Sequence, residues 1–344
     1  MALLSVSARP VEVAKYIKSR PSLQRCDPLR SVQRPASTFT MAHEVPAQSS
    51  GDSEAPFPLS GELKNYEIRQ LEPDHVEWVQ AIVGYTMSYK SPIWEDVRYD
   101  RGDDRGKTQR AYDMFHAIRD SSLQAINSGL SYGVFDKTWK GEYGVTWDFT
   151  KPNATEEQLL EGMQFPLVSI AMSKTSTAEQ LLANYKKEAG NNTEAVKGAA
   201  PSWKDILPLQ AIMSKDLKDQ EAKLLKTGFF DELPTGDAVR RSGTHTWGAE
   251  HTGKGLSRAL AHYMMDKAKA KGIKWIMIHT GSDAINKVWE NPPEGYKHHV
   301  TGEFNTANHR EVNTDTEQMH NPFGAAEVIC KRIWVDLQPK PDKK

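Results

Sequence analysis

Hydrophobic and polar positions repeat with two different periods along this chain, which predicts both strands and helices. A period of two marks residues 66–71 (YEIRQL) as a strand, and a helical period then begins at Pro73 and runs through Tyr85. A second helical pattern covers residues 107–128 and stops before a glycine. Further strands are predicted at 131–136, 143–149 and 165–172, the first two joined by a hairpin turn at Lys140-Gly141.

The most regular succession of elements lies between residues 239 and 296. VRRSGTHTW at 239–247 predicts a strand, and the glycine-containing turn GAEHTGKG follows it. An amphipathic helix is predicted over 256–271, and IKWIMI at 273–278 is apolar on both faces, as a covered central strand is. A short helix at 282–290 and a last strand at 326–337 complete the pattern. This alternation predicts an α/β fold whose sheet carries crossover helices.

Composition excludes several classes of function. The chain has 344 residues, of which 38% are hydrophobic and 26% charged, so it can bury a core. Its 44 basic and 45 acidic side chains nearly cancel, and non-specific nucleic-acid binding therefore has no support. The longest apolar run, 165–172, is too short to span a bilayer. Two cysteines, Cys26 and Cys330, suit neither a zinc cluster nor a disulfide framework, which favours an intracellular compartment.

The first 60 residues differ in composition from the rest. Residues 1–40 contain five arginines and two lysines against Glu12 and Asp27, which is typical of a mitochondrial transit peptide. The alternative is an ordinary tail, with Met41 as a second start. Residues 42–60 are rich in proline, serine and alanine and are interpreted as a linker. We therefore expect a disordered extension over 1–60 and a cytoplasmic or mitochondrial location.

The turn Gly253-Lys254-Gly255 carries the main functional signal. Glycines between a strand and a helix allow positive φ and a close approach of the backbone to a ligand. The free N–H groups of the following first helical turn then form an anion site. A tight connection without any ligand is the alternative interpretation of the same residues.

Two nucleotide-binding motifs fit this turn poorly. Gly248 to Lys254 match the G-x-x-x-x-G-K of a P-loop, but Gly255 follows where Ser or Thr must hold magnesium. Glu250 inside the loop would also repel phosphates. A dinucleotide turn would need a third glycine where Arg258 stands, and an acidic residue about 20 positions further on, which is absent.

The six residues Thr252-Gly253-Lys254-Gly255-Leu256-Ser257 resemble the signature Arg/Gln-x-x-Gly-x-Gly/Ala of the GNAT superfamily of acetyl-CoA-dependent N-acyltransferases. Thr252 stands where that family has Arg or Gln, and Ser257 is a small substitute for the last Gly or Ala. The close resemblance covers about 60 residues, and a looser order of elements extends over 66–336. Trp289 stands where family members often carry a tyrosine that protonates the leaving thiolate.

The resemblance implies a single GNAT-like α/β domain over 62–337, with a mixed, twisted sheet flanked by helices and opened where strands 239–247 and 273–279 splay. It implies acyl transfer, in the first place acetyl, from acetyl-CoA to a primary amine of a small molecule or peptide. Segment 174–236 would be an insertion, either a substrate-covering lid or a surface feature. The cofactor-binding residues implied are Trp247, Thr252, Gly253, Lys254, Gly255, Leu256 and Ser257, with a backbone N–H near Trp247 facing the thioester oxygen. A non-catalytic CoA-binding module on the same fold is the alternative.

The candidate general bases are His245 and Glu250. Strand alternation directs Thr244 and Thr246 to one face and His245 to the other. If that other face is the open cleft, an imidazole with an ordinary pKa of about 6.5 is well placed to accept the amine proton. If it is the core, His245 is a structural histidine and Glu250 or a water chain takes over.

The remaining histidines do not predict a metal cofactor. His309 and Glu311 could supply two ligands of an iron site, but only His320 remains downstream as a third. Histidines on a solvated loop over 298–320 explain the same residues, and we expect His298 and His299 to face water. The sequence therefore predicts acetyl-CoA as co-substrate and no metal.

Overall fold

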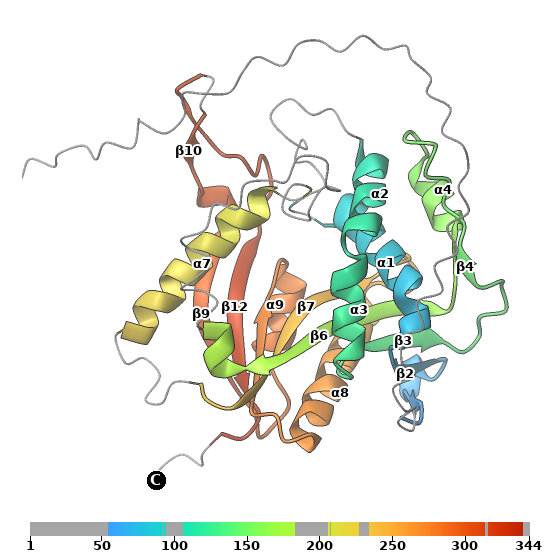
Figure 1. Ribbon diagram of the computed structural model, residues 1–344, viewed down its shortest axis with the longest axis horizontal. Helices are drawn as coiled ribbons and strands as arrows, with labels where there is room; N and C mark the ends of the chain where they lie inside the picture. Colours follow the sequence, from blue (N-terminus) through green and yellow to red (C-terminus); the bar gives the residue numbers. More distant parts are fainter. Residues whose placement is uncertain are drawn as a thin grey trace, which may run out of the picture. The chain divides into compact units, whose positions relative to one another are not determined.

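A computed structural model of the chain describes most of the residues after the predicted extension (Figure 1). The described residues are 54–91, 93, 106–182, 206, 208–226, 234–313 and 316–339. All of them belong to one compact unit, Asp52–Lys344. The residues assigned to a transit peptide, 1–40, lie outside the described residues. Within the described ranges, no helix combines the length and the apolar character that crossing a membrane requires.

An eight-stranded mixed sheet forms the centre of the unit. Every neighbouring pair of strands is antiparallel except β7 and β8, which are parallel. In order across the sheet the strands are β1 (Phe57–Pro58), β2 (Tyr66–Gln70), β3 (Tyr132–Asp136), β6 (Leu167–Thr177), β7 (Asp237–Thr246), β8 (Trp275–His279), β12 (Ile329–Asp336) and β9 (Lys297–Asn305). The predicted fold class, α/β with a large mixed sheet flanked by helices, is confirmed.

The sheet opens between its two parallel strands. β7 pairs with β8 only over Ala238–Arg241, opposite Trp275–Ile278. Beyond Arg241, β7 continues to Thr246 and pairs with β6 alone. The predicted splay between these strands is therefore confirmed, and it leaves one edge of β7 without a strand partner over its last five residues.

Helices cover both faces of the sheet. On one face lie the helices that follow β2, and on the other lie α8 and α9, whose apolar side chains join those of Val168, Ile276 and Ile278 in one core. In chain order the helices are α1 (Val76–Tyr89), α2 (Lys107–Ala117), α3 (Arg119–Asn127), α4 (Glu156–Glu161), α7 (Pro208–Lys226), α8 (Leu256–Ala270) and α9 (Asp283–Trp289). Short 3-10 turns lie at Gly61–Leu63, Pro73–His75 and Thr306–Asn308, and two small two-stranded sheets pair β4 (Gly144–Val145) with β5 (Met163–Gln164) and β10 (Glu311–Val312) with β11 (Met319–His320).

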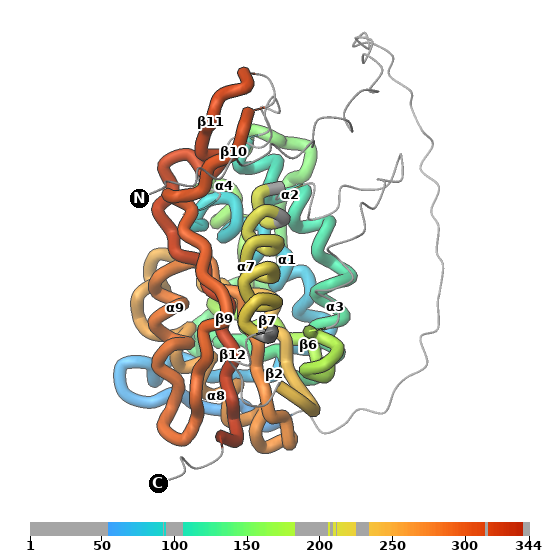
Figure 2. Tube along the Cα trace, turned by 90° about the vertical axis from the view of Figure 1, so that its left-hand side faces the viewer, coloured from blue at the N-terminus to red at the C-terminus, as the bar shows by residue number. Residues whose placement is uncertain are grey.

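Helix α7, from the predicted insertion, is packed into the fold. Figure 2 shows it beside β9 and β12, on the side opposite α9. Its Leu209, Met213 and Leu217 share a buried cluster with Met114 of α2 and Phe304 of β9. The helix thus connects the β9 end of the sheet with the helices over the other half.

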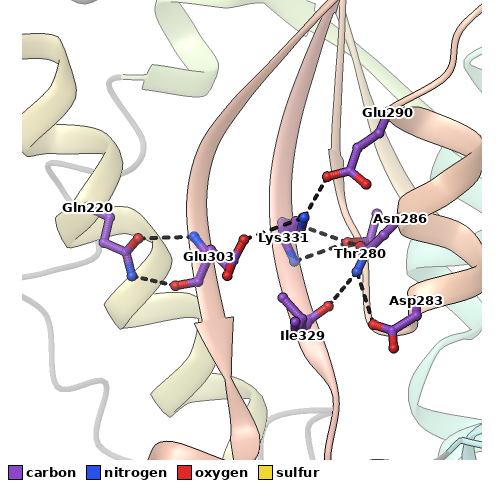
Figure 3. Close-up of polar contacts among 8 residues, drawn as sticks. All are labelled: Gln220, Thr280, Asp283, Asn286, Glu290, Glu303, Ile329 and Lys331. Atoms are coloured by element: carbon purple, nitrogen blue, oxygen red, sulfur yellow. Dashed lines mark hydrogen bonds and ion pairs between the residues drawn. The ribbon is translucent and has the colours of Figure 1, made fainter.

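Two polar contacts fix α7 to the sheet. The carboxylate of Glu221 is buried and lies 2.9 Å from a guanidinium nitrogen of Arg332 in β12. The side-chain amide of Gln220 accepts from the backbone N–H of Glu303 at 3.0 Å and donates to its carbonyl at 2.7 Å (Figure 3). Because β9 is an edge strand, this amide satisfies backbone groups that would otherwise be open to another strand.

The loop between β8 and α9 is held by a second network. The hydroxyl of Thr280 bonds the side chain of Asn286 and accepts from the backbone N–H of Lys331 at 3.1 Å (Figure 3). Asn286 also donates to the Ile329 carbonyl at 2.6 Å, and the Lys331 ammonium pairs with Glu290 at 2.5 Å. These bonds fix α9 against β12.

The structure corrects several predicted elements. The hairpin at Lys140-Gly141 is wrong, because β3 pairs with β2 and β6 while β4 pairs with β5. The helix over 107–128 is two helices that meet at Ile118. Strand β9 occupies part of the predicted loop over 298–320, and β6 extends to Thr177, into the predicted insertion. The described fold also begins before residue 60, because β1 pairs with β2.

Candidate functional site

The glycine turn before α8 has the backbone conformation that an anion site needs. Gly253 and Gly255 have φ of 80° and 84°, in the left-handed region, and Gly255 is the N-cap of α8 without any side-chain cap. A Cβ added at either position would meet no atom within 4 Å. Glycine is therefore required here by backbone conformation, and the space above the turn is open to a ligand.

The first turn of α8 offers its amides to that space. The N–H of Ala259 donates to the Gly255 carbonyl at 3.0 Å and closes the first helical turn. The N–H groups of Leu256, Ser257 and Arg258 precede it and find no acceptor in the described part of the chain, as expected at a helix start. The helix dipole adds a partial positive charge, and Lys254 and Arg258 are exposed beside it. The turn can hold an anionic group such as a pyrophosphate.

Three predicted binding residues use their side chains to build the turn. The side chain of Leu256 is 1% exposed and anchors the helix start in the core. The hydroxyl of Ser257 lies 2.9 Å from that of Thr246, and Thr252 donates to the Gly248 carbonyl at 2.9 Å. These residues offer backbone groups to a ligand, and their side chains hold the backbone in place.

The N–H donors of Trp247 itself both point toward β6, so a backbone donor near Trp247 would have to come from a neighbouring residue. Its backbone N–H donates to the Val168 carbonyl at 3.1 Å, and its indole Nε1 donates to the Leu167 carbonyl at 2.6 Å. Both donors of this buried residue are thus engaged with the segment of β6. Trp247 therefore does not present an N–H to a thioester oxygen.

The unpaired edge of β7 presents other amides. Backbone groups alternate in direction along a strand, and the N–H of Trp247 points toward β6. By this alternation the N–H groups of Thr246 and Thr244 point to the opposite edge, which β8 leaves after Arg241. The resemblance implies that the edge of strand 244–248 aligns the pantetheine, but which of its amides point to that edge depends on which strand lies beside β7 and cannot be predicted from the sequence.

His245 faces α1. Its Nδ1 lies 2.8 Å from the hydroxyl of Thr86, which itself donates to the Ile82 carbonyl at 2.7 Å. Because the Thr86 proton is used in that bond, Nδ1 of His245 is the donor, and the neutral ring carries its lone pair on Nε2. A Cβ at Gly243 would lie 2.9 Å from this Nε2, so the ring occupies space that only a glycine leaves open.

The electrostatic surroundings keep His245 neutral. Burial, followed by the positive charge of Arg241, lowers the pKa of His245 to about 4. At neutral pH the imidazole is therefore an unprotonated acceptor. No other described residue bonds its Nε2, and the orientation predicted from strand alternation is confirmed, since Thr246 faces α8 and His245 faces α1.

Glu250 is not brought to His245. It is exposed, and its carboxylate lies 3.1 Å from Nε2 of His251. The buried His251 in turn bonds the Tyr66 hydroxyl through Nδ1 at 3.0 Å. The ammonium of Lys254 lies 3.4 Å from the same hydroxyl. Glu250 therefore belongs to a polar cluster that connects the turn with β2.

Trp289 is a core residue of α9. Its side chain has no exposed surface and packs in the core between α8 and the sheet. Its indole Nε1 finds no hydrogen-bond partner among the described residues. The position that the resemblance assigns to a tyrosine thus holds a buried N–H donor instead of a hydroxyl.

Two of the histidines considered as metal ligands contact an aromatic ring and a carboxylate. His309 packs on Phe304 at 5.3 Å between ring centroids, and Nε2 of His320 lies 3.7 Å from Glu311. Among the described residues no group of three or more His, Cys, Asp or Glu side chains lies together. His298 and His299 are in β9, and the latter contacts Trp275 at 6.1 Å, so the expected solvated loop is corrected to a strand.

Among known proteins, this chain is similar to solved structures only. No family model matches the sequence, and no curated protein matches it. Arylalkylamine N-acetyltransferase 2 from Aedes aegypti is 12% identical, with 80% of this chain and 100% of that chain covered and a TM-score of 0.49. An agmatine N-acetyltransferase mutant in its apo form is 12% identical, with 79% and 98% covered and a TM-score of 0.45. YncA from Salmonella typhimurium, solved with acetyl-CoA, is 10% identical over 81% and 98%, with a TM-score of 0.33.

Proposed function

We propose that this protein is an N-acyltransferase, which moves an acyl group from a coenzyme A thioester to an amine. The observation that carries the proposal is the succession of two features along β7 and into α8. The strand has an unpaired edge at residues 242–246, and an open anion cradle follows at Gly253–Gly255. A CoA molecule has the matching order of groups, a pyrophosphate followed by an extended amide chain that ends in the thioester.

In this proposal the cofactor adds to the edge of β7. The pyrophosphate binds the amides of the first turn of α8, and Lys254 and Arg258 neutralise part of its charge. The two amide groups of the pantetheine arm take the place of a strand and bond Thr246 and Thr244. The thioester then lies near the end of the β7–β8 pairing, where a backbone donor aimed at the developing oxyanion contributes about 3 kcal/mol.

His245 is the proposed general base. It lies on the β7 face toward α1, and its Nε2 is an unprotonated acceptor at neutral pH. The amine attacks in its uncharged form, its nitrogen becomes acidic as the C–N bond forms, and Nε2 then accepts that proton; a positioned base contributes about 10²- to 10⁴-fold to such a step. Holding amine and thioester together supplies much of the remaining rate.

A ligand panel tests the first part of the proposal. CoA or acetyl-CoA at about 100 times its dissociation constant should stabilise the protein by about 2.7 kcal/mol in thermal unfolding. ATP with magnesium and NAD should leave the unfolding temperature unchanged, because the turn lacks a magnesium hydroxyl and a third dinucleotide glycine. Stabilisation by ATP without stabilisation by CoA would overturn the proposal.

Trp289 favours a second candidate, a CoA-binding module without catalysis. Its buried indole occupies the position that the resemblance gives to a proton donor. Incubation of acetyl-CoA with a panel of primary amines, followed by mass spectrometry, separates the two candidates. Formation of an acetylated amine and free CoA supports the enzyme, whereas CoA binding without any product across the panel supports the module.

A further inference from the structure

Arg241 lies where the two parallel strands separate. It is the last residue of β7 paired with β8, and its side chain is only 3% exposed. The guanidinium lies on the α8–α9 side of the sheet. One of its terminal nitrogens donates to the Met264 sulfur in α8 at 2.9 Å, and its central carbon lies 5.7 Å from the centre of the Trp289 ring in α9.

No anion compensates this buried charge within the described part of the chain. The guanidinium contacts only neutral groups there, namely the Ser173 and Thr244 hydroxyls, the Gly243 carbonyl and the Met264 sulfur. Burial lowers the pKa of Arg241 to about 9. A lone buried charge is unfavourable, and its presence here suggests that the protein binds an anion at this point.

Two buried donors next to each other lack acceptors. The Nε of Arg241 and the Nε1 of Trp289 have no hydrogen-bond partner among the described residues. The first comes from β7 and the second from α9, and the guanidinium carbon lies 5.7 Å from the centre of the indole ring. Both donors thus lack an acceptor next to an uncompensated positive charge, which favours an anionic partner over a cationic one.

We propose that Arg241 is a catalytic residue that stabilises the leaving thiolate of coenzyme A, in place of a tyrosine proton donor. This inference rests on the proposed function. The guanidinium reaches along β7 to the Gly243 carbonyl, at 3.2 Å, and to the Thr244 hydroxyl. Because Arg241 is the last residue of β7 that pairs with β8, its side chain leaves the strand at the point where the edge proposed for the pantetheine arm begins.

The chemical step balances with these residues. The amine nitrogen attacks the thioester carbon, a C–N bond forms, and Nε2 of His245 takes the proton that the nitrogen loses. The tetrahedral intermediate re-forms its carbonyl, the C–S bond breaks, and the electron pair remains on sulfur. Arg241 donates hydrogen bonds to that thiolate and keeps its own protons.

The pKa of the bound CoA thiol measures this interaction directly. The wild-type complex with CoA is titrated with pH while the ultraviolet absorbance of the thiolate is recorded, next to free CoA. We expect the bound thiol to have a pKa lower by about one unit or more, which is tenfold or more in the thiolate equilibrium. In Arg241→Gln the pKa should return to that of free CoA or rise above it.

Arg240→Gln is the matched control. This neighbouring arginine is exposed and points to the other face of β7, so its removal should leave the thiol pKa unchanged. Arg241→Lys keeps the charge and should retain part of the shift. If the glutamine variant does not fold, the wild-type titration and the lysine variant still decide, because an unshifted thiol in the wild-type complex overturns the inference.

Turnover gives a second readout. Arg241→Gln should lower kcat, and Trp289→Tyr added to it should restore part of the loss, because a phenol can protonate the thiolate. A purely structural arginine would show no such rescue. If rescue is absent and the pKa of the bound thiol is unshifted, the proposed catalytic role of Arg241 is rejected. Failure of the wild-type protein to bind CoA at all would instead reject the proposed function.

Discussion

The hydroxyl of Thr86 in α1 accepts a hydrogen bond from Nδ1 of His245 in β7 at 2.8 Å, although the two residues are 159 positions apart in the sequence. The bond fixes which nitrogen of the imidazole carries the proton and keeps the lone pair on Nε2. It also connects the helix that covers one face of the sheet with the strand whose edge is open. The proposed base is thus positioned by tertiary structure, not by its own strand alone.

Replacing Thr86 by Val should reduce turnover without abolishing CoA binding. Valine has a similar shape but cannot accept from Nδ1, so the ring loses its fixed tautomer and orientation. Misplacement of a catalytic group by about 1 Å can cost about 10²-fold. Steady-state kinetics and calorimetry with CoA check this, with Thr86→Ser as the control that retains the hydroxyl. Equal kcat in the serine and valine variants would mean that the bond has no part in catalysis.

Replacing His245 by Gln should lower kcat by about 10²-fold or more, with CoA affinity measured first. Because burial and Arg241 lower the pKa of the wild-type imidazole to about 4, its base form persists far into acid. The acidic limb of kcat/KM should therefore lie near pH 4 and not near pH 6.5, and it should vanish in the variant. A variant with wild-type turnover and an unchanged pH profile would exclude His245 as the base.

A carboxylate at Gly255 should abolish CoA binding while the fold persists. Gly255→Asp places a negative charge in the open space above the first turn of α8, where it opposes the pyrophosphate. The left-handed conformation costs a non-glycine residue about 1–2 kcal/mol, which a domain of this size tolerates. Calorimetry should show affinity reduced by about 10²-fold or more.

Gly295→Asp is the matched control for that substitution. Gly295 also has positive φ, 85°, and open space around it, but it lies in the turn between α9 and β9. It should carry the same conformational cost and leave CoA affinity unchanged. Similar affinity in the two variants would refute the phosphate cradle at Gly255.

Local pattern sufficed to predict the elements that build the opening, but not the contacts across it. The strand at 239–247, the glycine turn and the helix after it follow from short-range periodicity, and all three occur in the structure. The direction of the Trp247 N–H depends on which strand pairs with β7, and that pairing joins residues that are far apart in the sequence. Strand β9 was missed because its sequence, KHHVTGEFN, has few apolar residues; β12 and the amide of Gln220 satisfy its backbone.

Removing the carboxylate of Glu221 should destabilise the whole domain. Glu221 bonds Arg332 at 2.9 Å and the Trp334 indole N–H at 2.6 Å, all of them buried. Breaking a buried ion pair from one side costs about 3–5 kcal/mol. Urea unfolding of Glu221→Ala should show a loss of that size. The exposed Glu303→Gln should change the free energy of unfolding by less than about 1 kcal/mol, and equal losses in both variants would contradict a role for the buried pair.

Stability should fall in acid as two half-buried histidines are forced to accept protons. Burial lowers the pKa of His245 to about 4 and that of His279 to about 3, the latter with the positive charges of Arg332, Arg240 and Lys218 nearby. In the unfolded chain both return to about 6.5. Between pH 6.5 and 4 the unfolded state therefore binds more protons, and the free energy of unfolding decreases as the pH is lowered, by an amount on the order of a few kcal/mol.

Urea unfolding at several pH values between 7 and 4 measures this dependence. The double variant His245→Gln, His279→Gln should lose much of the slope, because glutamine takes up no proton in either state. The exposed His116→Gln serves as the control and should follow the wild-type curve. Carboxylates contribute mainly at the acidic end of this range, so the comparison between pH 6.5 and 5 isolates the histidines. A double variant that follows the wild-type curve over that interval would show that the fold does not lower the pKa of either histidine.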